Sequence, residues 1–262
     1  MTLAVVLLSI IIVLALSLYA VLATKSRSPS SLVTVSIPRR IVMTWKTAIE
    51  LAPKQFQENY AAMRRLHPSW DIVFMDDAAL EKFMTTEANE DFQSLYNRCA
   101  LRIQQIDIFR MAYVCKHGGF YLDCDFKVTQ PLDSACSRAS AVFPQELDRN
   151  TDDILQQRGC EYLVGNYAFG AVPGHPVFEK YVAHALASMG KVTMRGDTAD
   201  RRRVFYTTGP VAVTVAVLDA LEEDKGSVAV LKGNGNAQFG EYGVHQLAGT
   251  WKKNTEKVPQ PF

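Results

Sequence analysis

The stretch GGFYLDCDF, residues 118–126, decides how this chain folds and where its chemistry lies. Two glycines end a helical pattern, the apolar run Phe120 to Leu122 predicts a buried strand, and two acids follow it. Because residues two apart in an extended segment point the same way, the carboxylates of Asp123 and Asp125 should lie together. Such a pair is a natural site for a hard divalent cation, which can in turn hold a diphosphate. Cys124 should point away, because a soft thiolate suits a hard cation poorly.

A D-x-D pattern alone is also common in polar turns, so the segment before it matters. Residues 100–116 predict a helix, because apolar side chains recur at helical spacing (Ile106, Phe109, Ala112, Tyr113). Asp107 and Arg110 lie three apart on one face of this helix. They form either an ordinary ion pair on a solvated face or a buried pair with a function. Their apolar neighbours favour the second reading.

Strands and helices alternate through the rest of the chain. We predict strands at 40–44, 71–75 and 228–231, and helices at 53–66, from 77 behind a cap at Asp76, at 176–189 and at 210–221. This alternation predicts an α/β fold with helices on both faces of one sheet, and the ligand site outside the carboxyl ends of the strands.

The N-terminus carries an uncharged segment from Leu3 to Ala23, with only two serines among its 21 residues. As a helix it would span about 31 Å, the thickness of a hydrocarbon core. We therefore expect a transmembrane anchor over residues 1–24, a flexible stem over 25–36 and a catalytic domain over 37–262. A cleaved signal peptide is the alternative. Lys25 and Arg27 follow the span, and the positive-inside rule alone would place the domain in the cytoplasm.

Composition excludes some classes of function. The 262 residues carry 28 Lys and Arg against 27 Asp and Glu, a net charge of +1, so we expect no nucleic-acid partner. The run of three arginines at 201–203 should lie solvated in a polar loop, with phosphate or lipid head-group contact as the alternative. The five cysteines contain no C-x-x-C pair, which speaks against a zinc ribbon.

Together these residues resemble the D-x-D retaining glycosyltransferases. That family includes fungal Golgi initiating mannosyltransferases, inositol-phosphoceramide mannosyltransferases and animal α-1,4-galactosyl- and N-acetylglucosaminyltransferases. The resemblance rests on a pattern of Q-x-x-D-x-x-R, a helix, and G-G-x-Y-x-D-x-D, which this chain matches at Gln104, Asp107, Arg110, Gly118, Gly119, Tyr121, Asp123 and Asp125. Further matches are Pro38 and Trp45, Asn166 before PGHP at 173–176, TGP at 208–210, and HQLAGTW at 245–251.

The resemblance implies a GT-A-like nucleotide-diphospho-sugar transferase fold, with a single mixed sheet flanked by helices. It implies a nucleotide-diphosphate sugar donor, with GDP-mannose favoured and a UDP-hexose possible, and a glycan or glycolipid acceptor. Mn²⁺ or Mg²⁺ would be held by Asp123, Asp125 and His245, and the catalytic set would be Asp107, Arg110, Asp123 and Asp125. Donor binding would fall to Trp45, Asp107, Arg110, Tyr121, Asp123, Asn166, Thr250 and Trp251.

Two departures leave an alternative open. Gln246 replaces a second histidine of the closing motif, and Thr250 replaces its serine. A catalytically impaired sugar-binding or scaffold subunit is therefore the second hypothesis. A metal-dependent hydrolase is the third, although a paired His/Asp constellation is missing. The resemblance also favours a single-pass membrane protein with its catalytic domain in the Golgi or ER lumen, against the two charges that follow the span.

Overall fold

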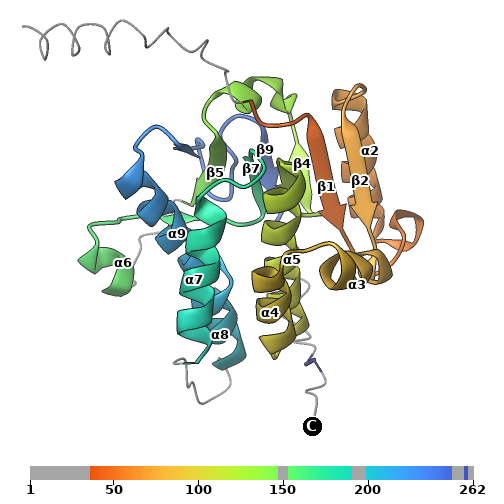
Figure 1. Ribbon diagram of the computed structural model, residues 1–262. Helices are drawn as coiled ribbons and strands as arrows, with labels where there is room; N and C mark the ends of the chain where they lie inside the picture. Colours follow the sequence, from red (N-terminus) through yellow and green to blue (C-terminus); the bar gives the residue numbers. More distant parts are fainter. Residues whose placement is uncertain (1–35, 147–152, 191–198, 250–256, 259–262) are drawn as a thin grey trace, which may run out of the picture. The chain divides into compact units, whose positions relative to one another are not determined.

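The centre of the fold is a seven-stranded sheet with the order β2-β1-β3-β7-β5-β6, and with β8 also paired to β5. A computed structural model describes residues 36–146, 153–190, 199–249 and 257–258 (Figure 1). Its strands are β1 (Arg40–Thr44), β2 (Asp71–Met75), β3 (Gly119–Leu122), β4 (Phe126–Val128), β5 (Ala141–Glu146), β6 (Leu163–Val164), β7 (Ala168–Ala171), β8 (Val228–Leu231) and β9 (Gly243–His245).

The helices fill the connections between these strands. They are α2 (Lys54–Leu66), α3 (Asp77–Thr86), α4 (Glu90–Arg98), α5 (Arg102–His117), α6 (Asp153–Gln157), α7 (Val177–Met189), α8 (Ala199–Thr207) and α9 (Pro210–Glu223), with 3₁₀ turns η1 (Ile49–Leu51) and η2 (Leu132–Ser137). The predicted helices and strands are all present, and the strands at 40–44, 71–75 and 228–231 have the predicted bounds.

The sheet is mixed, as predicted. β1 pairs in parallel with β2 and β3, and β8 pairs in parallel with β5, whereas β7 runs antiparallel between β3 and β5. The prediction of a single sheet was incomplete, because β4 and β9 form a separate antiparallel pair. This small pair carries His245 and therefore matters for the site.

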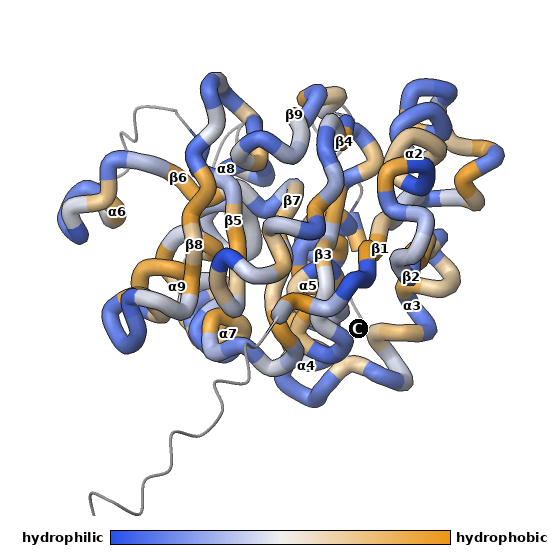
Figure 2. Tube along the Cα trace, turned by 90° about the horizontal axis from the view of Figure 1, so that it is seen from above, coloured by the Kyte–Doolittle hydropathy of each residue, from blue (hydrophilic) through white to orange (hydrophobic). Residues whose placement is uncertain are grey.

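Side chains alternate across the sheet, and helices cover both faces. On β1, Val42 packs into one core cluster, whereas Ile41 and Met43 pack into the other. The first cluster also holds apolar residues of α3, α4, α5, α7 and α9, and the second holds those of α2 and η2. The hydrophobic colour on β1 and β8 in Figure 2 follows from this burial. The period-two alternation of a strand thus produces the three layers.

The glycine pair at 118–119 lets the chain turn from α5 into β3. Gly118 has φ of 66° and Gly119 has φ of 93°. A Cβ on Gly118 would lie 2.6 Å from the Cδ of Pro173, and one on Gly119 would lie 2.6 Å from the carbonyl oxygen of Arg40. Only glycine fits both the backbone conformation and the space. β3 can therefore start directly after the helix.

The start of α5 and the position of the three arginines differ from the prediction. Helix α5 begins at Arg102 rather than 100, because the Gln104 side chain accepts the N–H groups of Ala100 and Leu101 and so caps the helix there. The arginines at 201–203 lie in α8, not in a polar loop. Cys124 and Cys136 are buried free thiols.

The predicted anchor and stem, residues 1–36, lie almost wholly outside the described residues. Within the described part, Asp200–Glu223 is apolar and long enough to cross a membrane. However, 67% of its most apolar window is buried inside the fold, as expected for a core helix.

His67 provides a pH-dependent contribution to stability. Its Nε2 accepts the N–H of Leu132 at 3.0 Å, so the proton must sit on Nδ1, which donates to the carbonyl of Met63 at 2.8 Å. Burial lowers its pKa more than the bond to Met63 and the charge of Asp133 raise it. The stability that the neutral ring contributes is thus complete above the ordinary value of 6.5, and it is lost as pH falls through the folded pKa.

We therefore expect the free energy of unfolding to fall more steeply with acid in the wild type than in His67→Gln, which cannot titrate. Urea unfolding at about pH 8 and about pH 5 measures this, because histidines titrate in that window. The difference in the free energy of unfolding between the wild type and His67→Gln should be smaller at the lower pH. A constant difference would mean that His67 keeps its ordinary pKa in the folded chain.

Candidate metal and donor site

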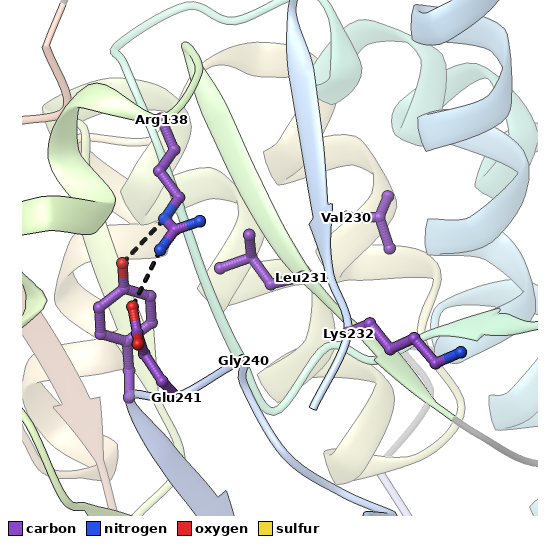
Figure 3. Close-up of a pocket in the computed structure, with 7 residues that line it drawn as sticks. Arg138, Val230, Leu231, Lys232, Gly240 and Glu241 are labelled. Carbon is purple, nitrogen blue, oxygen red and sulfur yellow. Dashed lines mark hydrogen bonds and ion pairs between the residues drawn. The ribbon is translucent and has the colours of Figure 1, made fainter. Parts of the chain in front are cut away.

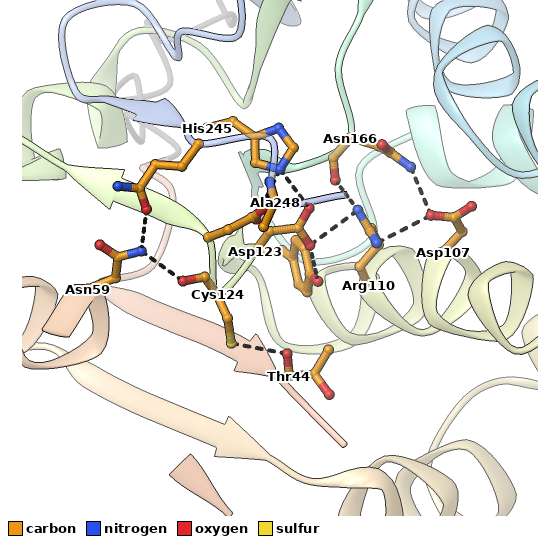
Figure 4. A network of polar contacts seen from close by, with 12 residues as sticks. Thr44, Asn59, Asp107, Arg110, Asp123, Cys124, Asn166, His245 and Ala248 are labelled. Atoms are coloured by element: carbon orange, nitrogen blue, oxygen red, sulfur yellow. Dashed lines mark hydrogen bonds and ion pairs between the residues drawn. The ribbon is translucent and has the colours of Figure 1, made fainter. Parts of the chain in front are cut away.

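A tight turn and strand β9 bring three side chains that could bind a metal ion together at the carboxyl end of β3 (Figure 4). The N–H of Phe126 donates to the carbonyl of Asp123 at 2.9 Å, so residues 123–126 form a turn, not the extended segment that we predicted. Phe126 begins β4 and lies opposite His245 on β9. That register places His245 Nε2 2.9 Å from Asp125 Oδ1 and 3.8 Å from Asp123 Oδ2.

The predicted ligands are therefore assembled, with one ligand atom of Asp123, Asp125 and His245 within 4.8 Å of the others. We call these three residues the triad. Their side chains are 23%, 12% and 16% exposed, so the triad is shielded and still reachable. Carboxylate oxygens are preferred ligands of Mg²⁺ and Mn²⁺, and an imidazole suits the transition metal of the two. The donor set thus fits the predicted cation.

Opposite charges hold the triad together. Burial by itself would lower the pKa of His245, but the hydrogen bond with Asp125 and the charges of both acids outweigh it and raise that pKa. Burial would raise the pKa of Asp125, but the bond and charge of His245 and the N–H of Ala248 lower it. Burial raises the pKa of Asp123, because the charge of Arg110 offsets only part of it. A cation bound here would take the place of the proton on His245.

Cys124 points away from the triad, as predicted. Its buried Sγ donates to the carbonyl of Thr44 at 3.1 Å, below the turn in Figure 4. Burial raises the pKa of this thiol, so it stays protonated. The thiol therefore does not compete for the cation.

Beside the triad lies a buried polar network built on α5. Arg110 donates to the carbonyl of Asn166 at 2.7 Å, and its guanidinium lies 3.3 Å from Asp107 Oδ1 and 3.5 Å from Asp123 Oδ1. The Asp107 and Arg110 side chains are each 4% exposed. The burial of both side chains excludes the hypothesis that Asp107 and Arg110 form an ordinary ion pair on a solvated helix face. Asn166, Asp107 and Arg110 are thus brought together with the triad, as the resemblance implied.

Asp107 is already fully engaged. Its Oδ1 accepts from Asn166 Nδ2 at 3.0 Å, and its Oδ2 accepts from the hydroxyl of Thr208 at 2.8 Å. Burial raises its pKa to about 6, although the charge of Arg110 and the bond from Thr208 oppose this. The hydrogen-bonding capacity of the carboxylate is largely spent inside the protein. Because both oxygens of Asp107 already accept hydrogen bonds, direct contact between Asp107 and a sugar stays a prediction.

Tyr121 links the network to the triad. Its hydroxyl donates to Asp123 Oδ1 at 2.6 Å, and the Arg110 guanidinium lies 4.7 Å from the centre of its ring. Asp123 is therefore anchored by two neighbours on one oxygen. Its other oxygen faces His245.

Two contacts of the D-x-D turn, with Asn59 and Ala248, were not predicted from the sequence. The amide of Asn59, on α2, donates to the carbonyl of Cys124 at 2.9 Å and to Gln246 Oε1 at 2.8 Å. The N–H of Ala248 donates to Asp125 Oδ2 at 2.9 Å. These bonds tie the D-x-D turn to the segment after β9. No motif marks Asn59, since only the fold brings positions 59, 124 and 246 together, and Ala248 lies in the HQLAGTW segment without a role assigned to it.

The remaining predicted residues are less well defined. Trp45 follows β1 at the same edge of the sheet, half-buried, with its ring edge-on to Phe56 at 4.8 Å. Thr250 and Trp251 lie outside the described residues.

A separate groove is lined by Arg138 and residues 230–232 and 240–242 (Figure 3). Arg138 donates there to Tyr242 and Glu241, and no triad residue lines the groove.

Comparison with known proteins agrees with this geometry. Residues 53–142 match the family described as glycosyltransferase sugar-binding region containing DXD motif. Inositol phosphoceramide mannosyltransferase 3 of Schizosaccharomyces pombe is 29% identical over 180 residues, 69% of this chain and 44% of the relative. Inositol phosphoceramide mannosyltransferase 2 of the same yeast is 27% identical over 178 residues, 68% of this chain and 45% of the relative. The chain thus spans less than half the length of these relatives.

Among solved structures, PaToxG glycosyltransferase aligns with a TM-score of 0.49 and 15% identity, over 73% of this chain and 71% of that one. The matched stretch of sequence holds α5, the D-x-D turn and the elements that flank them. The likeness to the family of glycosyltransferase sugar-binding regions that contain a DXD motif thus covers residues 53–142.

Proposed function

We propose that this chain is a cation-dependent, retaining glycosyltransferase that moves a hexose from a nucleotide-diphosphate sugar to a hydroxyl of a glycan or glycolipid. The observation that carries the proposal is the triad, whose ligand atoms lie within 4.8 Å of one another beside a buried arginine. The names of the two yeast relatives favour mannose, and hence GDP-mannose, with a UDP-hexose as the alternative. The same names favour a glycolipid acceptor.

The residues divide into those that would hold the diphosphate and those that would orient the sugar. Asp123, Asp125 and His245 would hold Mn²⁺ or Mg²⁺, which supplies a Lewis acid to neutralise the leaving diphosphate. Arg110 and Asn166 would face the sugar, with Asp107 fixing both of them. Trp45 would stack on the base. Thr250 and Trp251 would complete the phosphate contacts.

The chemistry that fits best is attack from the leaving-group side. The acceptor hydroxyl oxygen bonds to the anomeric carbon, the bond from that carbon to the diphosphate breaks, and the hydroxyl proton passes to the departing phosphate oxygen. Besides facing the sugar, Arg110 would stabilise the negative charge that develops on this phosphate oxygen. A covalent scheme with two carboxylates is a poor fit, because Asp107 is engaged on both oxygens and the triad acids would hold the cation.

The geometry gives little support to an impaired scaffold subunit. Gln246 was the feature that favoured it, but its side chain accepts from Asn59 and so helps to hold the turn. The triad needs no second histidine to bring its three ligand atoms together. The departure at position 246 is therefore compatible with catalysis.

Donor hydrolysis tests the proposal. The full chain, solubilised in detergent, is incubated with GDP-mannose, UDP-galactose or UDP-N-acetylglucosamine, with Mn²⁺ or with EDTA. We expect release of one nucleoside diphosphate that depends on Mn²⁺ and is lost in EDTA. Equal release in EDTA would contradict the role of the cation, and no release from any donor would favour the scaffold hypothesis.

For location, we propose a single-pass membrane protein with the catalytic domain in the Golgi or ER lumen. The wild type contains no N-x-S/T sequon, so a new one reports on topology without background. The change Glu256→Thr turns Asn254-Thr255-Glu256 into a sequon in a polar, Pro-containing tail. We expect a mobility shift in a eukaryotic host that a glycosidase reverses. No shift, together with cleavage by protease from the cytosolic side, would mean that Lys25 and Arg27 set the orientation.

A further inference from the structure

Within the described residues, His245 has no hydrogen bond of the kind that usually orients a metal-binding imidazole. In most such sites the ring nitrogen that does not bind the metal donates to a carboxylate, a backbone carbonyl or a water. Here Nε2 faces the two acids, so Nδ1 is the other nitrogen. Nδ1 is buried and has no hydrogen-bond partner within the described part of the chain. A contact of another kind can fix the plane of the ring.

The ring of Tyr167 lies flat against the imidazole. The two ring centres are 4.6 Å apart and the planes differ by 9°. Tyr167 is itself well fixed, since it is 3% exposed, stacks on Phe126 with ring centres 6.2 Å apart, and donates its hydroxyl to the carbonyl of Gln238 at 3.2 Å. A flat, immobile aromatic surface limits the rotation of the imidazole about its last side-chain bond.

The backbone of Tyr167 also reaches the triad. Its carbonyl accepts the N–H of Asp123 at 2.8 Å. One residue thus contacts both ends of the triad, Asp123 through its main chain and His245 through its ring. Its neighbour Asn166 contacts Asp107 and Arg110, so residues 166–167 connect the buried network with the cation site.

We propose that Tyr167 is a positioning residue of the cation site, and that its stacked ring replaces the missing hydrogen bond of His245. This inference rests on the proposed function, because it presupposes that the triad binds a cation. It assigns the orienting role to the ring and not to the hydroxyl, which donates to the carbonyl of Gln238.

The test uses the full chain in detergent and Mn²⁺ alone, with free Mn²⁺ followed by electron paramagnetic resonance. Loss of an orienting neighbour of a metal ligand typically weakens metal binding by about 10–100-fold. We expect that loss in Tyr167→Leu, whereas Tyr167→Phe, which keeps the ring, should bind like the wild type. Phe143→Leu is the matched control, because Phe143 is fully buried and stacked on Phe169 at 5.2 Å without being part of the site. It should leave Mn²⁺ binding unchanged.

A double-mutant cycle separates positioning from general damage to the fold. If Tyr167 acts through His245, then Tyr167→Leu should have no further effect on Mn²⁺ binding in a His245→Ala background. An equal loss with and without His245 would overturn the proposal, and so would wild-type binding in Tyr167→Leu. If the wild type itself fails to bind Mn²⁺, the proposed cation-dependent function is wrong. The role proposed for Tyr167 is then wrong as well, because it presupposes a bound cation.

A second measurement does not require the leucine variant to fold. A proton above an aromatic face is shifted upfield, so the imidazole resonances of His245 should be displaced in the wild-type protein. The chain has five histidines, and the resonance that disappears in His245→Gln identifies the right one. We expect the displacement in the wild type and in Tyr167→Phe. An ordinary chemical shift in the wild type without Mn²⁺ would show that the rings are not stacked in solution. That result would overturn the proposal even if the wild type binds Mn²⁺ in the separate assay.

Discussion

Asp125→Asn should lower sugar transfer by about 10³-fold or more, because a Lewis-acid cation contributes several kcal/mol to the transition state. The change removes one negative charge from the cation site and keeps the size of the side chain. Initial rates with saturating donor and a range of Mn²⁺ concentrations measure the effect. High Mn²⁺ should restore little of the lost rate.

The matched control is Asp133→Asn, because Asp133 is a half-exposed acid that pairs with Arg39 and is no part of the triad. It should transfer sugar like the wild type. The Asp125 side chain is only 12% exposed and accepts from both His245 and Ala248, so we expect Asp125→Asn to lower the free energy of unfolding by about 1–3 kcal/mol. Near-wild-type turnover of a folded Asp125→Asn protein would refute the metal assignment.

Arg110→Lys should lower transfer by about 10²-fold, the typical loss when one well-placed transition-state contact is removed. Lysine keeps the charge but cannot serve Asn166, Asp107 and Asp123 from one planar group. Arg110→Ala is a less informative variant. Removing one partner of a buried ion pair typically destabilises a protein by about 3–5 kcal/mol. Circular dichroism alongside the assay therefore has to show whether Arg110→Ala stays folded.

Arg102→Lys is the control for the lysine change. Arg102 lies on the same helix and pairs with Asp77 at 2.9 Å, with its side chain 15% exposed, but it contacts no residue of the triad. It should keep transfer near the wild-type rate. If both lysine variants lost activity equally, the loss would come from a damaged α5 and not from the site.

Much of the fold follows from local signals in the sequence. Pro53 and the Asp76 cap mark helix starts, and the β-rich runs at 40–44 and 71–75 mark strands with the right bounds. The missed elements lack such signals. β9 is three residues long and β7, residues 168–171, contains Gly170, so neither shows a clear alternation. Their pairing is decided by tertiary contacts.

The site residues also divide into those that a local sequence pattern predicts and those that only the fold brings together. Residues of the D-x-D segment and of α5 were found because they lie close together in sequence and form a pattern. Asn59 and Tyr167 were missed because their contacts with Cys124 and His245 join positions 65 and 78 residues apart. Thr208 lay within a recognised T-G-P turn, but its bond to Asp107 Oδ2 becomes apparent only once α8 and α5 are placed in the fold.

The most direct test of the central claim is calorimetric titration of GDP and UDP into the full-length protein with Mn²⁺ or with EDTA. The proposed triad predicts that one nucleotide binds with Mn²⁺, that EDTA abolishes the binding, and that Asp125→Asn binds neither nucleotide under either condition. Asp133→Asn should bind as the wild type does. Nucleotide binding of equal strength in EDTA, or undiminished binding by Asp125→Asn, would contradict the claim that these three side chains hold the diphosphate through a cation.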